Sequence, residues 1–401
     1  MYGAGNVGKQ FYNQIVETNF CEIVLWLDKN ADGILTKKPE AIASLGVDDY
    51  DFVVIGIENE VIVFEVKDFL MNHGVFESRI LHQAHIGLLS TVRLEASTIC
   101  QLNCKSCIMR KNNSGTVGKG FLKFENFKKF VDKNKSIKTI ELSNYGEIFL
   151  NPELLDIIKY AYLRKVRLQA TNGVNFNTLS DEMLDGLVKY KFLYLLFSID
   201  GASQDIYSQY RCGGNFDTVI SNVKKLIEYK KKHNSDLPKL AWQYILMSHN
   251  ECDVIKAKEI AQELRIPINF KLSWDKGITF NNPEMLKQET GLQYLTREEY
   301  LSFKGEIYSS NICRQLFDGP QINWDGRLLG CCGNAIKGDY GVNVFEIGLN
   351  EALKSPNYIL AKKMLIGKAQ ASENPVNIPC AVCPIYKHMV KTNSYLQGVI
   401  I

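Results

Sequence analysis

Short apolar runs alternate with stretches of helical spacing through the middle of this 401-residue chain. The apolar runs have the length of strands and are rich in β-branched and aromatic residues. Six such strand–helix units predict an α/β fold with a parallel sheet, right-handed crossovers and ligands at the carboxyl ends of its strands. The predicted strands are Val92–Glu95, Lys138–Leu142, Val166–Ala170, Leu193–Ile199, Leu240–Met247 and Asn269–Leu272. The predicted helices are 123–134, 151–163, 181–189, 215–233 and 251–264.

The two ends of the chain follow other patterns. The first residues predict a small α/β unit, with strands at Glu22–Asn30 and Tyr50–Asn59 and a helix at Val63–Gly74. After about residue 295, Gly and Asn become frequent, and few helices are predicted. Five cysteines collect there, which predicts an irregular module that needs a metal to fold. The length also favours two or three domains, and the predicted domains are 1–88, 89–295 and 296–401.

Composition narrows the range of partners. The chain is 46% hydrophobic and 23% charged, as a soluble globular protein is, and its net charge of +3 is too small to predict nucleic-acid binding. Its strand-sized apolar runs, such as Phe192–Ile199, predict no membrane span, and no signal peptide is visible. Eleven cysteines without a secretion signal point to metal or redox chemistry in the reducing cytoplasm.

Three cysteines follow the first strand of the central repeat. Cys100, Cys104 and Cys107 have the spacing C-x3-C-x2-C. A closed zinc site needs a fourth ligand, for which His82 and His85 are the nearest candidates. The alternative is a four-iron cluster on three thiolates, which leaves one iron open for a small molecule.

The next three strands are also followed by candidate polar residues. The segments are LSNYGEIFLNPE, ATNG and SIDGASQDIYSQYRCGGNF. Each is ordinary when taken singly, because TNG is a common turn and a lone Glu or Arg usually lies at the surface. Together, in this order at the ends of successive strands, the segments are hard to obtain by chance.

Over about residues 90–275 this arrangement resembles the radical S-adenosylmethionine (SAM) superfamily. The resemblance implies a partial (β/α)6 TIM-like barrel and a [4Fe-4S] cluster on Cys100, Cys104 and Cys107, with SAM on its open iron. Gly146 and Glu147 match the segment near the methionine amino group, although Ile148 replaces the usual proline. The residue before the third cysteine is usually aromatic and packs near adenine, but here it is Ser106. The remaining SAM-binding candidates, at the strand ends and near the ribose and carboxylate, are Asn172, Ser198, Asp200 and Arg211.

The resemblance also implies a reaction. An electron from a flavodoxin or ferredoxin-type donor cleaves SAM reductively, and the 5′-deoxyadenosyl radical then abstracts hydrogen from a substrate carbon. Cys212 follows Arg211 directly and could return a hydrogen atom in an epimerisation. Asp275 ends the sixth strand and could act as a base for a substrate hydroxyl, although most such aspartates only cap a turn.

The C-terminal cysteines form a second set. GRLLGC and CAVC resemble the SPASM type of extension, which carries auxiliary iron–sulfur clusters. One auxiliary [4Fe-4S] cluster is implied, on Cys313, Cys331, Cys380 and Cys383, with Cys332 as the alternative to Cys331. From the residues alone, a zinc ribbon with four thiolates is the other interpretation.

The N-terminal segment YGAGNVG has the pattern G-x-G-x-x-G. Gly3, Gly5 and Gly8, with Asp28 after the next strand, match a dinucleotide fingerprint, but only Met1 and Tyr2 precede the motif. The first strand is therefore predicted to be missing or truncated. The segment resembles small Rossmann-like domains attached to sugar-modifying proteins, with a possible nucleotide ligand or else a docking or structural role.

Together these observations favour a radical SAM oxidoreductase or epimerase that acts on a carbohydrate or another small molecule. One alternative is a maturase that modifies a ribosomally made peptide. An alternative of another class is a non-catalytic protein that binds zinc and a nucleotide.

Overall fold

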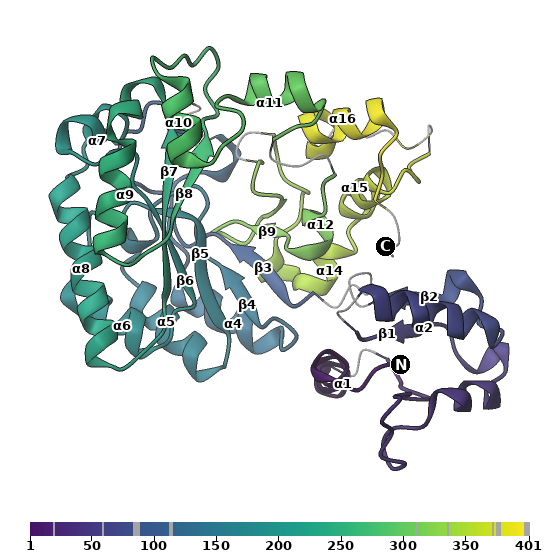
Figure 1. Cartoon of the computed structure of the whole chain (residues 1–401). Coiled ribbons are helices and arrows are strands. Elements are labelled where there is room, and N and C mark those ends of the chain that lie inside the picture. Colours follow the sequence, from purple (N-terminus) through teal and green to yellow (C-terminus); the bar gives the residue numbers. More distant parts are fainter. Residues whose placement is uncertain are drawn as a thin grey trace. The chain divides into compact units, whose positions relative to one another are not determined.

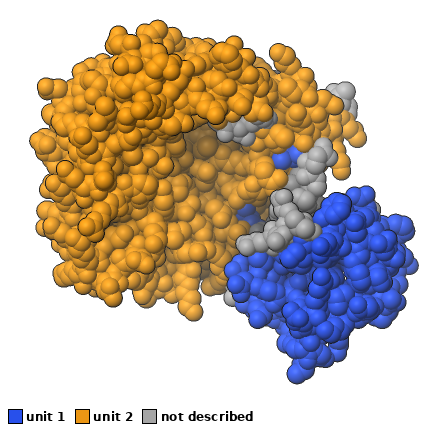
Figure 2. Space-filling view, in the orientation of Figure 1, with its two compact units in different colours: residues 1–89, 396–401 blue, residues 90–395 orange. Residues whose placement is uncertain are grey.

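The computed structural model describes residues 1–18, 21–57, 60–82, 89–111, 115–308, 312–334, 337–370, 373 and 378–396. The chain divides into two compact units, coloured separately in Figure 2. The first comprises residues 1–89 and 396–401, and the second comprises residues 90–395. Among the helices of the described residues, none is long and apolar enough to cross a membrane.

An eight-stranded sheet forms the centre of the second unit (Figure 1). Its strand order is β10-β9-β3-β4-β5-β6-β7-β8, and the strands from β3 to β8 are parallel neighbours in chain order. This confirms the predicted α/β fold with a mostly parallel sheet. The six strands are β3 (Thr91–Leu94), β4 (Thr139–Glu141), β5 (Arg167–Val174), β6 (Tyr194–Ser198), β7 (Lys239–Leu246) and β8 (Ile268–Leu272).

Helices connect these strands and cover one face of the sheet (Figure 1). Their N-termini are capped where the sequence supplies a short polar side chain: Ser180 accepts from the Met183 N–H and Asn215 accepts from the Thr218 N–H. The short helix α7 (Gln204–Tyr210) was not predicted. The five predicted helices are present as α4 (Phe124–Lys133), α5 (Leu154–Leu163), α6 (Asp181–Lys189), α8 (Phe216–Lys232) and α9 (Val254–Glu263).

The strands at one side of the sheet have one apolar and one polar face. Val92, Leu94 and Ile140 are fully buried, and they alternate with Arg93 and Glu141. Parallel strands covered on both faces are usually apolar throughout. The polar residues on β3 and β4 therefore depart from this rule, and the functional site described below involves them.

The chain after residue 295 contains more helix than the sequence predicts. The prediction of few helices there is wrong, because six α-helices occur among its described residues. Three of the six are only four or five residues long, too short to give a helical period, and some end at glycines such as Gly305 and Gly348. The helices from residue 283 onward are α10 (Pro283–Thr290), α11 (Arg297–Lys304), α12 (Gln315–Asp318), α13 (Val344–Ile347), α14 (Leu349–Leu353), α15 (Pro356–Leu365) and α16 (Pro384–Thr392).

This part of the chain also extends the sheet. Strand β9 (Gln321–Ile322) pairs with β3 in parallel, and β10 (Leu328–Gly330) pairs with β9 in antiparallel orientation. Residues on both sides of the predicted boundary at 295 belong to the second unit. A separate C-terminal module stays a prediction. The remaining short elements of this unit are α3 (Ile108–Lys111), η5 (Gly115–Val117), η6 (Ile148–Leu150), η7 (Ser248–Asp253) and η8 (Pro379–Val382).

The first unit has a small parallel arrangement of its own. Strands β1 (Val53–Ile55) and β2 (Ile80–His82) pair in parallel, and Tyr2 bridges to both Ile55 and Leu27. Leu27 in turn bridges to Lys37. Of the predicted strand Glu22–Asn30, Leu27 is the one residue that forms a bridge, and the rest is not strand. Tyr2 is the paired position between Leu27 and Ile55, directly before the glycine pattern. The other elements are α1 (Asn6–Thr18), η1 (Pro39–Ser44), η2 (Val47–Asp49), α2 (Glu60–Asn72) and η3 (Glu77–Arg79).

Candidate functional site

The three-cysteine loop begins where β3 ends and is held by backbone hydrogen bonds. The Asn103 N–H donates to the Cys212 carbonyl (2.8 Å), and the Glu147 N–H donates to the Ile99 carbonyl (2.9 Å). Cys104 is buried, whereas Cys100 is exposed. Although the Cys100 residue keeps exposed surface, desolvation around its thiol raises the pKa of Cys100 to about 12. The three thiols belong to one loop of eight residues, 100–107.

Gly146 packs directly against this loop. A Cβ atom built on Gly146 would lie 2.4 Å from the Ser97 carbonyl oxygen and 2.8 Å from the Ile99 nitrogen. Real Cβ atoms do not approach backbone atoms so closely, so the position requires glycine. The contact joins the segment after β4 to the cysteine loop.

Glu147 lies next to Gly146 and is almost completely buried. Its carboxylate accepts from the Asn175 N–H (2.6 Å) and the Phe149 N–H (3.3 Å). Burial raises the pKa of Glu147 to about 7. Asn175 also extends its Nδ2 to within 3.6 Å of the Cys100 Sγ and contacts Gln101. Sequence reasoning missed Asn175 and Gln101, although Asn175 stands only two residues beyond the ATNG segment.

Arg211 and Asp200 form a buried ion pair beside the loop. The Arg211 Nε and Nη2 both lie 2.6 Å from the Asp200 Oδ2, and Nη1 lies 3.8 Å from the Cys104 Sγ. Asp200 is completely buried and also accepts from the Ile245 N–H (2.8 Å). Burial works to lower the pKa of Arg211, but the surrounding negative charges, Asp200 first, raise it. The structure thus places a fixed positive charge at the predicted cluster ligand.

Ser106 and Asp275 meet at the same edge of the sheet. The Ser106 hydroxyl donates to the Asp275 carboxylate, which joins the cysteine loop to the end of β8. The Tyr210 ring centroid lies 5.3 Å from the Arg211 guanidinium carbon. The sequence pointed to Ser106 and Asp275 separately but not to their contact.

The other predicted SAM-binding residues also lie at the strand ends. The Asn172 Nδ2 donates to the Ser143 carbonyl (2.6 Å). Ser198 lies against Gly173, whose Cβ would be 2.0 Å from the Ser198 Oγ. The Cys212 thiol lies 3.9 Å from the Gln209 carbonyl within its own turn, and its backbone carbonyl holds the cysteine loop.

The C-terminal cysteines gather inside the second unit. Burial raises the pKa values of Cys313, Cys331 and Cys380, the last to about 12. Cys380 is the first neighbouring charge acting on Cys331, and Cys383 is the first acting on Cys313. The Tyr340 hydroxyl lies 3.3 Å from the Cys380 Sγ. All four predicted ligands of the auxiliary cluster belong to the second unit.

Cys332 is engaged by the side-chain amide of Gln315. In the amide orientation that satisfies both groups, the Gln315 oxygen accepts from the Cys332 N–H (3.0 Å) and from the Arg93 Nε (3.2 Å). In the part of the chain that the structure describes, no three His, Cys, Asp or Glu side chains are grouped as ligands for one metal ion.

Comparison with known proteins relates the central residues of the chain to a protein superfamily. Residues 94–239 match the profile of the radical SAM superfamily. These residues form a radical SAM domain. The matched segment contains the three-cysteine loop, Glu147 and Arg211. No curated protein matches the chain.

Solved structures of similar fold extend beyond this domain. SuiB from Streptococcus suis has a TM-score of 0.54 at 12% identity, over 99% of this chain and 90% of SuiB. A structure of SuiB bound to S-adenosylmethionine has a TM-score of 0.53 at 13% identity, over 83% and 78% of the two chains. Native anSMEcpe with bound AdoMet has a TM-score of 0.50 at 15% identity, over 75% of this chain and 96% of its own. At these identities the likeness shows a shared fold.

A polar cluster lies beside the radical SAM domain's first strand, and sequence reasoning missed it. We call Arg93, Glu95, Tyr145 and Gln321 the Glu95 cluster. Glu95 is fully buried and accepts from the Tyr145 N–H (3.1 Å) and the Gln321 Nε2 (3.3 Å). Arg93 pairs with Gln321 across β3 and β9. The signal in the sequence was the charged pair in VRLEAST, which interrupts an otherwise apolar strand.

Three polar atoms of the Glu95 cluster have no partner among the described residues. They are the Arg93 Nη1, the Tyr145 Oη and the Gln321 Oε1, and all three are buried. Buried polar atoms normally form hydrogen bonds, and an unpartnered one costs about 1–3 kcal/mol. The neighbouring Asn144 Nδ2 donates to the Cys332 carbonyl (3.1 Å). The segment 144–147 therefore connects Cys332 to the three-cysteine loop.

Replacing Glu95 by glutamine is expected to change how stability depends on pH. Burial is the largest cause that raises the pKa of Glu95 from its ordinary value of 4.5 to about 8. Between these values the folded state keeps a proton that the unfolded state releases, so stability falls as pH rises from about 4.5 to about 8. Glu95→Gln carries no such proton and should lose this slope. Urea unfolding at several pH values measures it, and an equal slope in both proteins would contradict the pKa shift.

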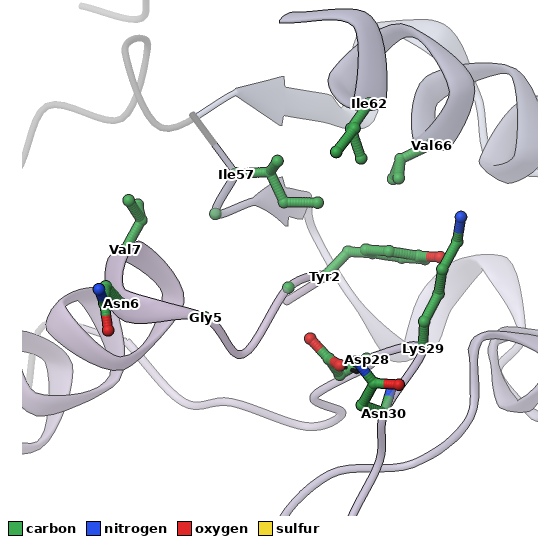
Figure 3. Close-up of a pocket in the computed structure, with 12 residues that line it drawn as sticks. Tyr2, Gly5, Asn6, Val7, Asp28, Lys29, Asn30, Ile57, Ile62 and Val66 are labelled. Atoms are coloured by element: carbon green, nitrogen blue, oxygen red, sulfur yellow. Dashed lines mark hydrogen bonds between the residues drawn. The ribbon is translucent and has the colours of Figure 1, made fainter. Parts of the chain in front are cut away.

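The four N-terminal candidates come together in the first unit. Gly3, Gly5 and Asp28 line a cavity of about 420 Å³, shown in Figure 3. Gly8 lies behind it, with its α-carbon against Gly3 and Gly56.

Proposed function

We propose that the chain is a radical SAM enzyme that abstracts hydrogen from a small polar substrate. The observation that carries this proposal is the meeting of Cys100, Cys104 and Cys107 with Glu147 and the Arg211–Asp200 pair at the carboxyl ends of parallel strands. We interpret the curved sheet as a partial (β/α)6 TIM-like barrel. A flavodoxin or ferredoxin-type protein would donate the electron.

The residues at this edge suit a cluster and SAM. Cys100, Cys104 and Cys107 would hold a [4Fe-4S] cluster, which leaves one iron open because the loop supplies three thiolates. When bound, the cluster and SAM supply the one-electron cleavage that generates a 5′-deoxyadenosyl radical. Arg211 would balance negative charge beside Cys104, and the Glu147 carboxylate can accept a hydrogen bond from an amino group.

The C-terminal cysteines support a second cluster of the SPASM type. Cys313, Cys331, Cys380 and Cys383 would hold an auxiliary [4Fe-4S] cluster with all four irons ligated. Cys331 is the proposed fourth ligand because Cys380 is the first neighbouring charge on its thiol, and Cys332, which also neighbours Cys313 and contacts Gln315, is the alternative. A fully ligated cluster can accept an electron from a substrate radical but cannot bind SAM.

Anaerobic reconstitution tests both clusters together. Two four-iron clusters predict about eight irons per chain. Dithionite should then release 5′-deoxyadenosine from SAM. Bound zinc in place of iron, with no cleavage of SAM, would favour the non-catalytic alternative and end the proposal.

The substrate is proposed from the Glu95 cluster. The Arg93 Nη1, the Tyr145 hydroxyl and the Gln321 Oε1 have no partner among the described residues. These atoms can form hydrogen bonds with the hydroxyl groups of a carbohydrate or another small alcohol. The alternative is a ribosomally made peptide, because SuiB bound to its precursor peptide SuiA also has a similar fold, with a TM-score of 0.53. Deuterium transfer from labelled candidates into 5′-deoxyadenosine would distinguish the two classes.

Tyr145→Phe is expected to weaken substrate use without stopping SAM cleavage. The ring packs against Val117 and Leu329, so phenylalanine keeps the packing and removes only the hydroxyl. Once a substrate is found, its KM should rise about tenfold for one lost hydrogen bond. Release of 5′-deoxyadenosine in the absence of substrate should be unchanged. An unchanged KM would remove Tyr145 from the substrate site.

A further inference from the structure

The cavity in the first unit has one apolar and one polar wall. Ile57, Ile62 and Val66 lie on one side, and Asp28 and Lys29 lie on the other (Figure 3). Its volume of about 420 Å³ falls within the range of small-molecule sites, roughly 300–1,000 Å³. Ile62 keeps 37% of its surface exposed, which is high for an isoleucine that lines a cavity. The cavity can therefore take a ligand with an apolar face and a polar edge.

The three glycines have different steric surroundings. Gly3 has φ +99°, and a Cβ there would meet the Ile57 side chain at 2.8 Å, so Gly3 makes the tight turn. A Cβ on Gly8 would lie 1.9 Å from the Gly3 carbonyl oxygen, so Gly8 allows the helix to pack closely. A Cβ on Gly5 would meet nothing within 4 Å. Packing within the protein therefore explains Gly3 and Gly8 but not Gly5, which lines the cavity.

The strand order places this loop at a switch point. Across the sheet the paired positions lie in the order Lys37, Leu27, Tyr2, β1 and β2. After Tyr2 the chain first adds Leu27 and Lys37 on one side of Tyr2, and then adds β1 and β2 on the opposite side. In parallel α/β sheets, ligands bind in the crevice where the order reverses. Gly3 and Gly5 follow Tyr2 at this point, and α1 begins at Asn6.

Asp28 completes the polar wall. Its Oδ2 accepts from the Ala4 N–H (2.5 Å) and its Oδ1 accepts from the Asn30 N–H (2.7 Å). A carboxylate has about four lone-pair positions, so both oxygens can still accept hydrogen bonds from ribose hydroxyls. No arginine is among the described residues that line the cavity. A phosphate on a ribose hydroxyl would therefore face a carboxylate.

We propose that this cavity binds a ribonucleoside diphosphate, either free or as part of a dinucleotide or nucleotide sugar. The diphosphate lies beside Gly5, where the first-turn N–H groups of α1 have no acceptor within the helix. The ribose hydroxyls bind Asp28, and the base lies against Ile57 and Ile62. Every residue that forms this site belongs to the first unit, and none is among the residues proposed to hold the cluster or SAM.

Calorimetry on the full chain without SAM tests the site with ADP, UDP, NAD⁺ and UDP-glucose as probes. Binding of at least one probe is expected. Preference for NAD⁺ would identify a dinucleotide, preference for UDP-glucose a nucleotide sugar, and equal binding of ADP or UDP a free nucleotide. 2′-Deoxy-ADP and NADP⁺ should bind at least about fivefold more weakly than ADP and NAD⁺, because they lose or block a hydroxyl at Asp28.

Two variants and a control locate the binding. Gly5→Val fills the diphosphate position without a clash inside the protein and should weaken binding by about tenfold or more. Asp28→Asn should remove the preference for ADP over 2′-deoxy-ADP. Ile34→Ala, a change at a side chain that is 86% exposed and outside the cavity, should bind as wild type does. No binding of any probe at about 1 mM, or equal binding by wild type and Gly5→Val, would overturn the proposal. Release of 5′-deoxyadenosine should be the same in all four proteins.

Discussion

Cys104→Ala is expected to abolish release of 5′-deoxyadenosine and to halve the iron content of the reconstituted chain. If Cys100, Cys104 and Cys107 hold one four-iron cluster, two remaining thiolates cannot retain it, whereas the C-terminal set is untouched. Iron should therefore fall from about eight to about four per chain. Cys104 is also the thiol that the Arg211 guanidinium contacts, at 3.8 Å. The substitution therefore removes a proposed cluster ligand and also the thiol that the buried Arg211 guanidinium contacts.

Cys252→Ala is the matched control. The Cys252 thiol is exposed and lies 4.0 Å from the His249 carbonyl, within its own turn. This variant should keep about eight irons and full SAM cleavage. If Cys104→Ala also kept all of its iron and its activity, the three-cysteine loop would not be the cluster site.

Asp200→Ala is expected to lower the free energy of unfolding of the second unit by about 3–5 kcal/mol. The substitution leaves the Arg211 guanidinium buried without its carboxylate, and removing one partner of a buried pair is far more costly than removing both. It also leaves the Ile245 N–H without its acceptor. Because Arg211 contacts Cys104, iron incorporation should fall as well. Urea unfolding, followed by the fluorescence of the buried Trp242 on the neighbouring strand, measures the change in stability.

Asp181→Ala provides the comparison at the surface. Asp181 pairs with Lys225 at 2.9 Å, but the two side chains are 64% and 47% exposed. Water screens an exposed pair and leaves it little effect on stability, so this variant should unfold almost as wild type does. Equal losses in the two variants would mean that the Asp200–Arg211 pair has no special role in holding the site.

The polar residues of the site were predictable to different degrees. Glu147, Asp200 and Arg211 could be found because their segments resemble those of the radical SAM superfamily and occur in the same order along a parallel strand–helix repeat. The Glu95 cluster could not be found in this way. Gln321 stands 226 positions after Glu95, and only the pairing of β9 with β3 brings the two side chains together.

The short C-terminal helices show a second limit. A helix of four or five residues has fewer than two turns, so its apolar residues cannot repeat at a recognisable period. Such helices are stabilised by packing rather than by propensity. Leu316 on the four-residue helix α12, for example, is buried, and its carbonyl accepts a hydrogen bond from the Tyr358 hydroxyl (2.7 Å).

The sequence by itself determined the order of the strands and of five helices in the central repeat, the three-cysteine loop and the glycine pattern at the N-terminus. These features depend on spacing over a few residues, which a single chain displays directly. The tertiary structure alone decided which distant residues meet. Ser106 and Asp275 are 169 positions apart, and Asn144 and Cys332 are 188 apart. Such contacts follow from how the sheet curves and from which strand extends its edge, and neither leaves a local pattern in the sequence.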